Sequence, residues 1–464
     1  MSSETVQQAG ADPRAAPLQL AGIRRPAPLL AALRADAERM VALRDVGRAL
    51  LGSRLLVWAA AAATIALFGF GPTRGAFDPS ITRGSGWLGR VLAAPAARWD
   101  SAWYLVIAHF GYRPDLGSFT EPRDAFFPLY PLGLRGIAWL GVPAILAGVL
   151  LSTAALAGAL YGIHRLTTLE LDRRPDAGTR DSARLAVLLT AFAPMAFFLS
   201  AVYSESLYLA LSVAVFWSAR QGRWALAGVL GALAGATRST GLVLLLPALV
   251  IYLYGPREDR SPDFERQGRA RLLGRYRLRP DVLWLGLMPA GVALFGLWLA
   301  LDGGSVLAPF HAQEVWGREL AGPFVGVWDG IRAAFEGVRQ LLSFQTRHIY
   351  YPSASGSPTV AASHNVSLLA FLLMAIPMLV WTARRLPGAY LAYVVAALAL
   401  PLSYPVPAQP LMSLPRFLLV LFPLTIASAM WLSSHPRAQR PLIALSALLM
   451  VVFVAQFATW HWVA

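Results

Sequence analysis

The sequence has no cysteine and few charged residues, and both absences narrow its class. Without cysteine the chain cannot form disulfides, thiolate metal sites or a cysteine nucleophile. Only 14% of the 464 residues are charged and 56% are hydrophobic, whereas roughly a quarter of the residues of a soluble domain are charged. Because a water-soluble core cannot bury that much apolar surface, we predict one membrane domain rather than several soluble ones.

The charges that remain are strongly biased toward the basic side. The formal net charge is +15, from 40 Lys and Arg against 25 Asp and Glu. The basic residues collect in particular loops, which indicates contact with anionic lipid headgroups. A nucleic-acid partner is excluded as an interpretation because it would require a soluble basic face, and the sequence shows none.

Residues 1–54 form a tail rich in Ala, Pro and Arg ahead of the first apolar run. We predict that this tail is cytoplasmic and partly disordered, and that 55–464 is a single membrane domain. A cleaved signal peptide is not expected, because the N-terminus lacks a short positive segment followed at once by an apolar stretch. The basic residues that lead to the first run are Arg24, Arg25, Arg34, Arg39, Arg44, Arg48 and Arg54.

About eleven apolar runs approach the roughly 20 residues that a membrane helix requires. They lie near 55–71, 137–163, 183–200, 207–219, 224–237, 240–254, 281–301, 365–382, 388–404, 417–433 and 441–458. The sequence therefore predicts an all-α polytopic membrane protein with about eleven transmembrane helices.

The arginine distribution predicts which loops face the cytoplasm. With the N-terminus inside, alternate loops hold Arg173 to Arg184, Arg220 and Arg223, Arg257 to Arg279, Arg384 and Arg385, and Arg437 and Arg440. Because successive spans place loops alternately inside and outside, all of these loops can lie inside together. The segments near 72–136, 200–206, 238–239, 302–364 and 405–416 then lie outside. The loops 72–136 and 302–364 are too long for connectors, so we expect interfacial helices or a small cap in them.

The first long outer loop contains an acid among tryptophans, in the run from Arg98 to Tyr104. A carboxylate in such surroundings is costly, and at helical spacing Asp100 and Tyr104 share a face, as do Trp99 and Trp103. Asp100 is therefore a candidate catalytic group facing an aromatic cleft. The alternative is an interfacial aromatic belt in which Asp100 pairs with Arg98 or caps a helix.

Further ionisable groups lie where outward loops meet apolar runs. Glu205 follows Ser204 in AVYSESLY, and Arg238 lies in GATRSTG. They are functional candidates by position, and the alternative for Glu205 and Arg238 is a structural ion pair. Arg416, in SLPRFLL, is expected to extend to the interface or to bind a lipid phosphate.

The second long outer loop contributes His311, Arg347 and His348 as candidate cleft residues. These three lack the spacing of metal ligands on one helix, so we predict no metal site.

Five stretches make the sequence similar to the PIG-V family of mannosyltransferases. They are RWDSAWYLVIAHFGY (98–112), FFPLYPL (126–132), FFLSAVYSESLYLAL (197–211), GALAGATRSTGL (231–242) and LPRFLLVLFP (414–423). The resemblance covers residues 50–250 well and, beyond them, the LPRFLL stretch. It implies the GT-C fold of multi-span glycosyltransferases that use lipid-phosphate sugars.

The resemblance implies transfer of mannose from polyprenyl-phosphate-mannose to a hydroxyl of a glycolipid or glycan, with inversion to an α linkage. Asp100 would be the general base, and Arg238 and Arg416, with Arg98 in reserve, would bind the donor phosphate. The substrate cleft is expected to be formed by Trp99, Trp103, Tyr104, Tyr203, Ser204, Glu205, His311, Arg347 and His348. The lipid-linked donor is a substrate, and no cofactor or metal is expected.

Two other readings remain open. A transporter or flippase of lipid-linked sugars would also have about a dozen spans, although no internal repeat is evident. An assembly subunit is the third, because the eukaryotic enzyme of this family works with a partner, and we expect that a small membrane subunit can bind here. The composition indicates a prokaryotic homologue in the plasma membrane with its site on the outer face, or in the endoplasmic reticulum membrane with a lumenal site if the source is eukaryotic.

Overall fold

The computed structural model describes residues 28–71, 79–82, 84, 86–112, 122–171, 179–263, 274–350 and 357–464. Secondary structure in these residues is helical, apart from one isolated bridge between Val406 and Gln409. The predicted all-α class is therefore confirmed for this part of the chain.

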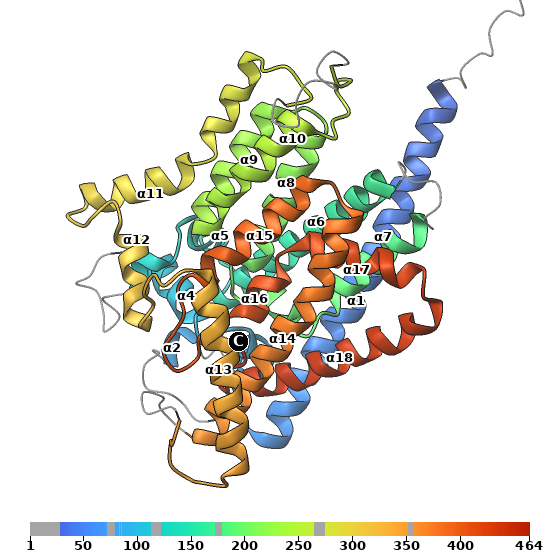
Figure 1. The fold of residues 1–464 in the computed structure, drawn as a ribbon. Coiled ribbons are helices and arrows are strands. Elements are labelled where there is room, and N and C mark those ends of the chain that lie inside the picture. The colour runs from blue at the N-terminus through green and yellow to red at the C-terminus, as the bar shows by residue number, and fades with distance from the viewer. Residues whose placement is uncertain are drawn as a thin grey trace, which may run out of the picture. The chain divides into compact units, whose positions relative to one another are not determined.

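Helices of many lengths follow one another along the chain (Figure 1). The α-helices are α1 (Pro28–Phe68), α2 (Pro79–Thr82), α3 (Gly86–Leu88), α4 (Ser101–Phe110), α5 (Leu129–Ala138), α6 (Ala144–Leu171), α7 (Thr179–Ala191), α8 (Glu205–Arg220), α9 (Trp224–Thr237), α10 (Leu245–Tyr254), α11 (Ala290–Leu301), α12 (Ala308–His311), α13 (Pro323–Leu342), α14 (Pro358–Arg385), α15 (Gly388–Leu402), α16 (Leu414–Leu419), α17 (Phe422–Ser433) and α18 (Pro436–Ala458). The 3-10 and π turns are η1 (Gly89–Ala93), η2 (Ala94–Ala96), η3 (Pro122–Ala125), η4 (Ala196–Leu199), η5 (Ser239–Leu244), η7 (Pro280–Leu287) and η8 (Ala312–Trp316).

The chain divides into two compact units, Met1–Val41 and Ala42–Ala464, and the candidate site lies in the second. Residues 1–27 of the predicted tail lie outside the described residues. Helix α1 begins at Pro28, well before the predicted first span at 55. In the second unit Ala42, Val46 and Ala49 are buried, and this spacing of four and three residues is that of an amphipathic helix.

Arg54, the last residue of the predicted tail, is buried in the structure. Its guanidinium is buried and donates hydrogen bonds to the carbonyls of Ala191 and Ala196 and to the hydroxyl of Ser200. Because the last carbonyls of a helix have no partner within it, Arg54 serves as hydrogen-bond donor for Ala191, the last residue of α7.

The predicted count of about eleven spans is not confirmed. Within the described residues, four helices are long and apolar enough to cross a membrane: Asp36–Phe68, α6, α14 and α18. The pair formed by η7 and α11, bent by 44°, makes a fifth if it is one span. Other predicted runs form shorter helices because the chain breaks within them, as in the run 183–200, where α7 ends at Ala191 and the turn η4 follows at Ala196. The predicted break between the runs 224–237 and 240–254 is present at Arg238, whose backbone is extended (φ −157°, ψ 146°).

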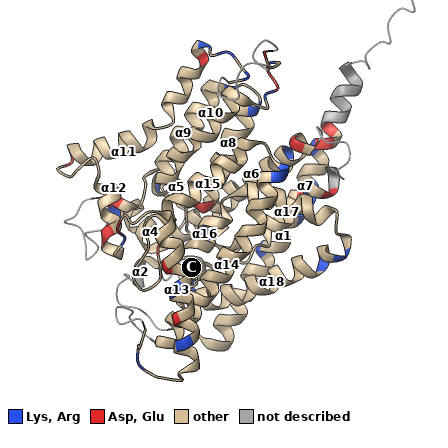
Figure 2. Ribbon diagram, viewed as in Figure 1, with Lys and Arg blue, Asp and Glu red and all other residues tan. Residues whose placement is uncertain are grey.

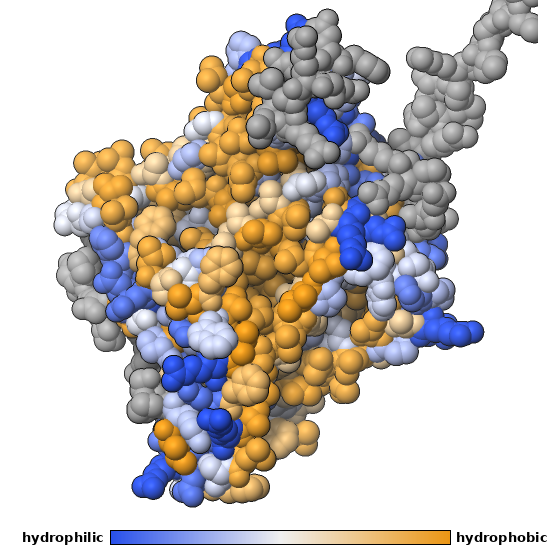
Figure 3. Space-filling view, in the orientation of Figure 1, coloured by the Kyte–Doolittle hydropathy of each residue, from blue (hydrophilic) through white to orange (hydrophobic). Residues whose placement is uncertain are grey.

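The long helices carry the surface expected of a protein in lipid. On α18, Leu445 and Leu448 are more than half exposed, and on α14 so are Leu373 and Ile376. Figure 3 shows apolar residues over the middle of the visible face, and Figure 2 shows that acidic and basic residues gather toward helix ends and loops. Contiguous apolar surface of this kind indicates an integral membrane protein.

Both predicted outer segments contain helices. The first holds α4 and α5, and the second holds α12 and α13. Helix α13 packs on α14 and buries small residues there, whereas Phe324, Trp328 and Phe335 on its other side are exposed. Such amphipathic helices are typical of the membrane interface. Helix α8 is central, because it packs against both α6 and α9, and its first residue lies at the candidate site.

Candidate active site

Asp100 lies where the chain turns from η2 into α4. The preceding residue, Trp99, has a left-handed backbone (φ 55°), which is uncommon for a bulky residue and marks a constrained position. Asp100 occupies the position that precedes the first turn of α4, but its side chain makes no capping hydrogen bond. The carboxylate is therefore directed away from its own helix.

The alternative in which Asp100 caps a helix or pairs with Arg98 is wrong. The guanidinium of Arg98 donates instead to the carbonyls of Ala94 and Ala458, at 2.6 and 3.2 Å, and lies over the ring of Trp460. The partner of Asp100 is Arg416, whose Nη1 lies 2.7 Å from Asp100 Oδ2. Among the described residues, the other carboxylate oxygen of Asp100 accepts no hydrogen bond, so it is available to a substrate.

Arg416 does not extend to the interface as predicted, because it is buried between two carboxylates. Besides Asp100 it contacts Glu205, whose Oε1 accepts hydrogen bonds from Arg416 Nε at 3.0 Å and Nη2 at 2.7 Å. Its guanidinium also lies 4.8 Å from the ring centroid of Tyr203. The residue before its helix, Ser413, is left-handed (φ 70°), so both partners of the Asp100–Arg416 pair follow constrained turns.

Glu205 joins Arg416 to Arg238. Glu205 is the first residue of α8 and is fully buried, and Arg238 Nη1 lies 2.9 Å from its Oε1. The predicted ion pair between Glu205 and Arg238 is therefore confirmed. Burial alone would raise the pKa of Glu205, but the charges of Arg416 and Arg238 together lower this pKa to about 2. Glu205 is thus ionised at neutral pH and pairs with two guanidinium groups.

Aromatic and hydroxyl groups support this charged cluster from behind. Tyr104 and Ser204 share a hydrogen bond of 2.8 Å, and Tyr203 donates to the Arg98 carbonyl at 3.0 Å. Trp99 makes edge contacts with Trp460 and with a second C-terminal tryptophan, Trp462. The segments before α4 and α8 and the C-terminal end of the chain are thereby fixed against one another.

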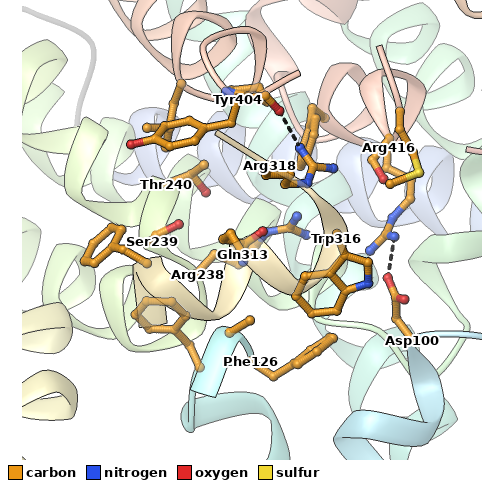
Figure 4. A pocket seen from close by; sticks show the side chains of 18 of the residues that line it. Asp100, Phe126, Arg238, Ser239, Thr240, Gln313, Trp316, Arg318, Tyr404 and Arg416 are labelled. Atoms are coloured by element: carbon orange, nitrogen blue, oxygen red, sulfur yellow. Dashed lines mark hydrogen bonds and ion pairs between the residues drawn. The ribbon is translucent and has the colours of Figure 1, made fainter. Parts of the chain in front are cut away.

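The charged cluster opens onto a cavity of about 620 Å³ (Figure 4). Among the residues that line it, Asp100 is the acidic one and Arg238, Arg318 and Arg416 are the basic ones. Its other lining residues are Trp99, Tyr104, Ala125, Phe126, Phe127, Thr237, Ser239, Thr240, Phe310, Gln313, Trp316, Leu400, Pro401, Tyr404, Met412, Ser413, Phe417 and Trp462. The mixture of aromatic walls with a few convergent polar groups is typical of a ligand site.

Some of the predicted site residues line the cavity and others do not. Trp99 and Tyr104 line the cavity, and Tyr203, Ser204 and Glu205 are buried behind the wall. Trp103 stacks on the lining residue Phe126 without lining the cavity itself. Four further predicted residues do not line it, namely Arg98, His311, Arg347 and His348.

Arg318 is the functional candidate that sequence reasoning missed. It follows Gly317, whose left-handed backbone (φ 67°) ends the turn η8, and its Nη1 donates to the Tyr404 carbonyl at 3.2 Å (Figure 4). The available signal was an arginine close to the aromatic Trp316 in an outer loop. Unlike Arg238 and Arg416, it is not bounded by apolar runs, and so it did not stand out.

The arrangement can accept a proton and stabilise an anion. Asp100 offers a fixed carboxylate with one unoccupied oxygen, and three guanidinium groups around the cavity favour a phosphate. Within the described part of the chain, no group of three or more His, Cys, Asp or Glu residues lies close enough to hold a metal ion.

Comparison with known proteins points to one family. Residues 80–251 match the family described as Mannosyltransferase (PIG-V). The chain is 34% identical over 153 residues to GPI alpha-1,6-mannosyltransferase 2 of Cricetulus griseus, covering 32% of this chain and 29% of that protein. It is 32% identical over 182 residues to the same enzyme of Rattus norvegicus, covering 36% of this chain and 34% of that protein. The chain thus spans about a third of the length of these curated relatives.

Among solved structures, the oligosaccharyltransferase of Archaeoglobus fulgidus aligns with a TM-score of 0.41 and 14% identity, covering 88% of this chain and 55% of that one. The family match is more specific, because residues 80–251 include Asp100, Glu205 and Arg238 of the charged cluster. Over residues 80–251 the chain is therefore similar to the PIG-V family of mannosyltransferases.

Proposed function

We propose that the chain transfers mannose from polyprenyl-phosphate-mannose to a hydroxyl group of a glycolipid or glycan. The single observation that carries the proposal is the placement of Asp100, which is free of its helix, fixed by Arg416 and directed at a cavity with three guanidinium groups. The match of residues 80–251 to a mannosyltransferase family supports mannose as the transferred group. A lipid-linked donor suits a site on an apolar membrane chain.

In the proposed reaction Asp100 is the general base. Its unoccupied oxygen takes the proton of the acceptor hydroxyl while the acceptor oxygen attacks the anomeric carbon of mannose. The bond between that carbon and the phosphate oxygen breaks, and its electron pair stays on the departing lipid phosphate. A β-linked donor then gives an α-linked product, and nearby guanidinium groups stabilise the phosphate charge that develops.

The site is proposed to face the non-cytoplasmic side of the membrane. This orientation follows from the arginine-bearing loops, which are expected inside. The segments that contribute Asp100, Glu205, Arg238 and Arg416 all belong to the predicted outward parity, and they converge in one cluster. If these four segments lie on the same side of the membrane, their side chains must be able to meet, as they do in this cluster.

The experiment is a transfer assay on the full chain purified in detergent. Supplied with polyprenyl-phosphate-mannose and membrane lipid extract, the protein should attach mannose to an acceptor, whereas a nucleotide-linked mannose should not serve as donor. Reconstitution in vesicles separates the alternative: movement of the lipid-linked sugar across the bilayer without any transfer would identify a flippase and refute the enzyme.

A further inference from the structure

Arg318 differs from the other two cavity arginines in what holds its charge. Arg416 donates to Asp100 and Glu205, and Arg238 lies within ion-pair distance of Glu205. Arg318 donates one hydrogen bond to the backbone carbonyl of Tyr404 and, among the described residues, has no carboxylate within ion-pair distance. Within the described part of the chain, Arg318 is therefore the cavity arginine that forms no ion pair with a carboxylate.

The charged groups at the cavity carry a net charge of one positive unit, which one bound negative charge would balance. Three guanidinium groups, of Arg238, Arg318 and Arg416, stand against the two carboxylates of Asp100 and Glu205. Burial and the neighbouring Arg416 lower the pKa of Arg318 to about 10, although the charge of Asp100 acts in the opposite direction, so Arg318 is still protonated at neutral pH. A partly buried cation without a counterion is unfavourable unless an anion binds beside it.

We propose that Arg318 is the binding residue for the donor phosphate, while Arg416 is a positioning residue that holds Asp100. This inference rests on the proposed function. A sugar phosphodiester carries one negative charge, which matches the net charge of one positive unit at the cavity. The guanidinium of Arg318 keeps N–H donors beyond the one given to Tyr404, and guanidinium forks fit phosphate oxygens.

Apolar residues beside Arg318 favour a lipid phosphate over a free one. Phe310 and Trp316, from α12 and η8, line the cavity on the same segment of chain. The side chain of Phe310 is 40% exposed although it lines the cavity, so it marks a place where the cavity opens to the surface. A prenyl chain attached to the phosphate can leave the cavity across this aromatic edge.

The test compares the binding of farnesyl phosphate and farnesol to the full chain in detergent micelles by titration calorimetry at a pH of about 5, where the phosphate monoester, like the donor phosphodiester, carries one negative charge. The wild-type protein should bind the phosphate about ten- to a hundredfold more tightly than the alcohol, which is the range for charged hydrogen bonds. Arg318→Gln retains a donor for the Tyr404 carbonyl and should abolish this preference without weakening farnesol binding. Arg318→Lys replaces the planar guanidinium by a compact ammonium group of the same charge and should retain part of the preference for the phosphate.

The matched control is Arg332→Gln, which removes an exposed arginine paired with Glu336 on α13. It should leave the phosphate preference unchanged. In transfer assays, Arg318→Gln should raise the KM for the donor by a similar factor and leave the KM for the acceptor unchanged. Inorganic phosphate should compete only weakly, because it lacks the prenyl chain.

The outcomes separate this inference from the proposed function. An Arg318→Gln protein that keeps its preference for farnesyl phosphate overturns the inference, as does a change confined to the acceptor KM, even if the wild-type protein transfers mannose. If the wild-type protein transfers no mannose but its phosphate preference depends on Arg318, the binding site stands and the proposed transfer fails. Loss of folding in Arg318→Gln shifts the test to Arg318→Lys, for which an undiminished phosphate preference contradicts bidentate binding.

Discussion

Replacing Glu205 by Gln tests the charged cluster at its most buried point. Glu205 is fully buried, and its Oε1 is within 3.0 Å of two nitrogens of Arg416 and of Nη1 of Arg238. Glutamine keeps the shape of the side chain but removes its charge. Arg416 is then left with Asp100 alone, and Arg238 is left with no carboxylate partner among the described residues.

The expected cost follows from the burial of these groups. Removing one partner of a buried ion pair typically destabilises a protein by about 3–5 kcal/mol, because the other charge stays buried without compensation. An exposed pair would cost about 0–1 kcal/mol. Since Glu205 compensates two guanidinium groups, we expect a loss in the upper range, together with a fall in transfer because Asp100 is no longer held in place.

The assay is thermal or denaturant unfolding in detergent, combined with the transfer rate per folded protein. Glu170→Gln is the matched control, because Glu170 is also buried and accepts hydrogen bonds from Arg220 and Tyr390 far from the cavity lining. It should lose comparable stability and keep its transfer rate. A Glu205→Gln protein as stable as the wild type would show that the cluster does not carry the burial cost assigned to it.

Three further predictions follow from the same contacts. Arg416→Lys should lower the transfer rate by about ten- to a hundredfold in kinetic assays, because an ammonium group cannot hold two carboxylates in one geometry; an unchanged rate would contradict a positioning role. Tyr104→Phe loses its bond to Ser204 and should cost about 1 kcal/mol in unfolding experiments while the chemical step is retained; a large loss of transfer would assign Tyr104 to the reaction. Because the chain has no cysteine, each of the variants Ser261→Cys and Thr346→Cys carries a single thiol that can be treated with a membrane-impermeant maleimide in intact cells. Only Thr346→Cys, on the predicted outer side, should react, and reaction of Ser261→Cys alone would reverse the topology.

Much of the site could be predicted because membrane solvation limits where charges can lie. Asp100, Glu205, Arg238 and Arg416 each interrupt or border apolar sequence, where an ionisable group is costly without a partner. Loop parity assigned them to one side, and the structure brings them together. Proximity of this kind follows from topology and requires no knowledge of side-chain geometry.

The pairing within the cluster could not be predicted. That Asp100 binds Arg416 rather than Arg98 depends on the left-handed turn at Trp99, which directs the carboxylate away from its own helix. Arg318 was missed because no apolar run borders it, so its position depends on the tertiary packing of an outer loop. Tertiary contacts of this kind leave no periodic signal in the sequence.

Helix boundaries failed where propensity and hydrophobicity disagree. The segment before residue 55 contains many arginines, yet Ala, Leu and Arg are good helix formers, and α1 begins at Pro28. In the opposite sense, the predicted apolar run 183–200 does not form one helix, because α7 ends at Ala191 and the separate turn η4 follows at Ala196. Hydrophobic length alone therefore does not predict where individual helices begin and end.

The transfer rate of Asp100→Asn tests the central claim most directly. Asn keeps the size of the side chain and removes its basicity, and Asp100 makes no capping bond that Asn would have to replace. General-base catalysis typically contributes about a hundred- to ten-thousand-fold, so the rate of the chemical step should fall on that scale while farnesyl phosphate binding persists. Turnover close to that of the wild-type protein would remove Asp100 from the mechanism and contradict the account.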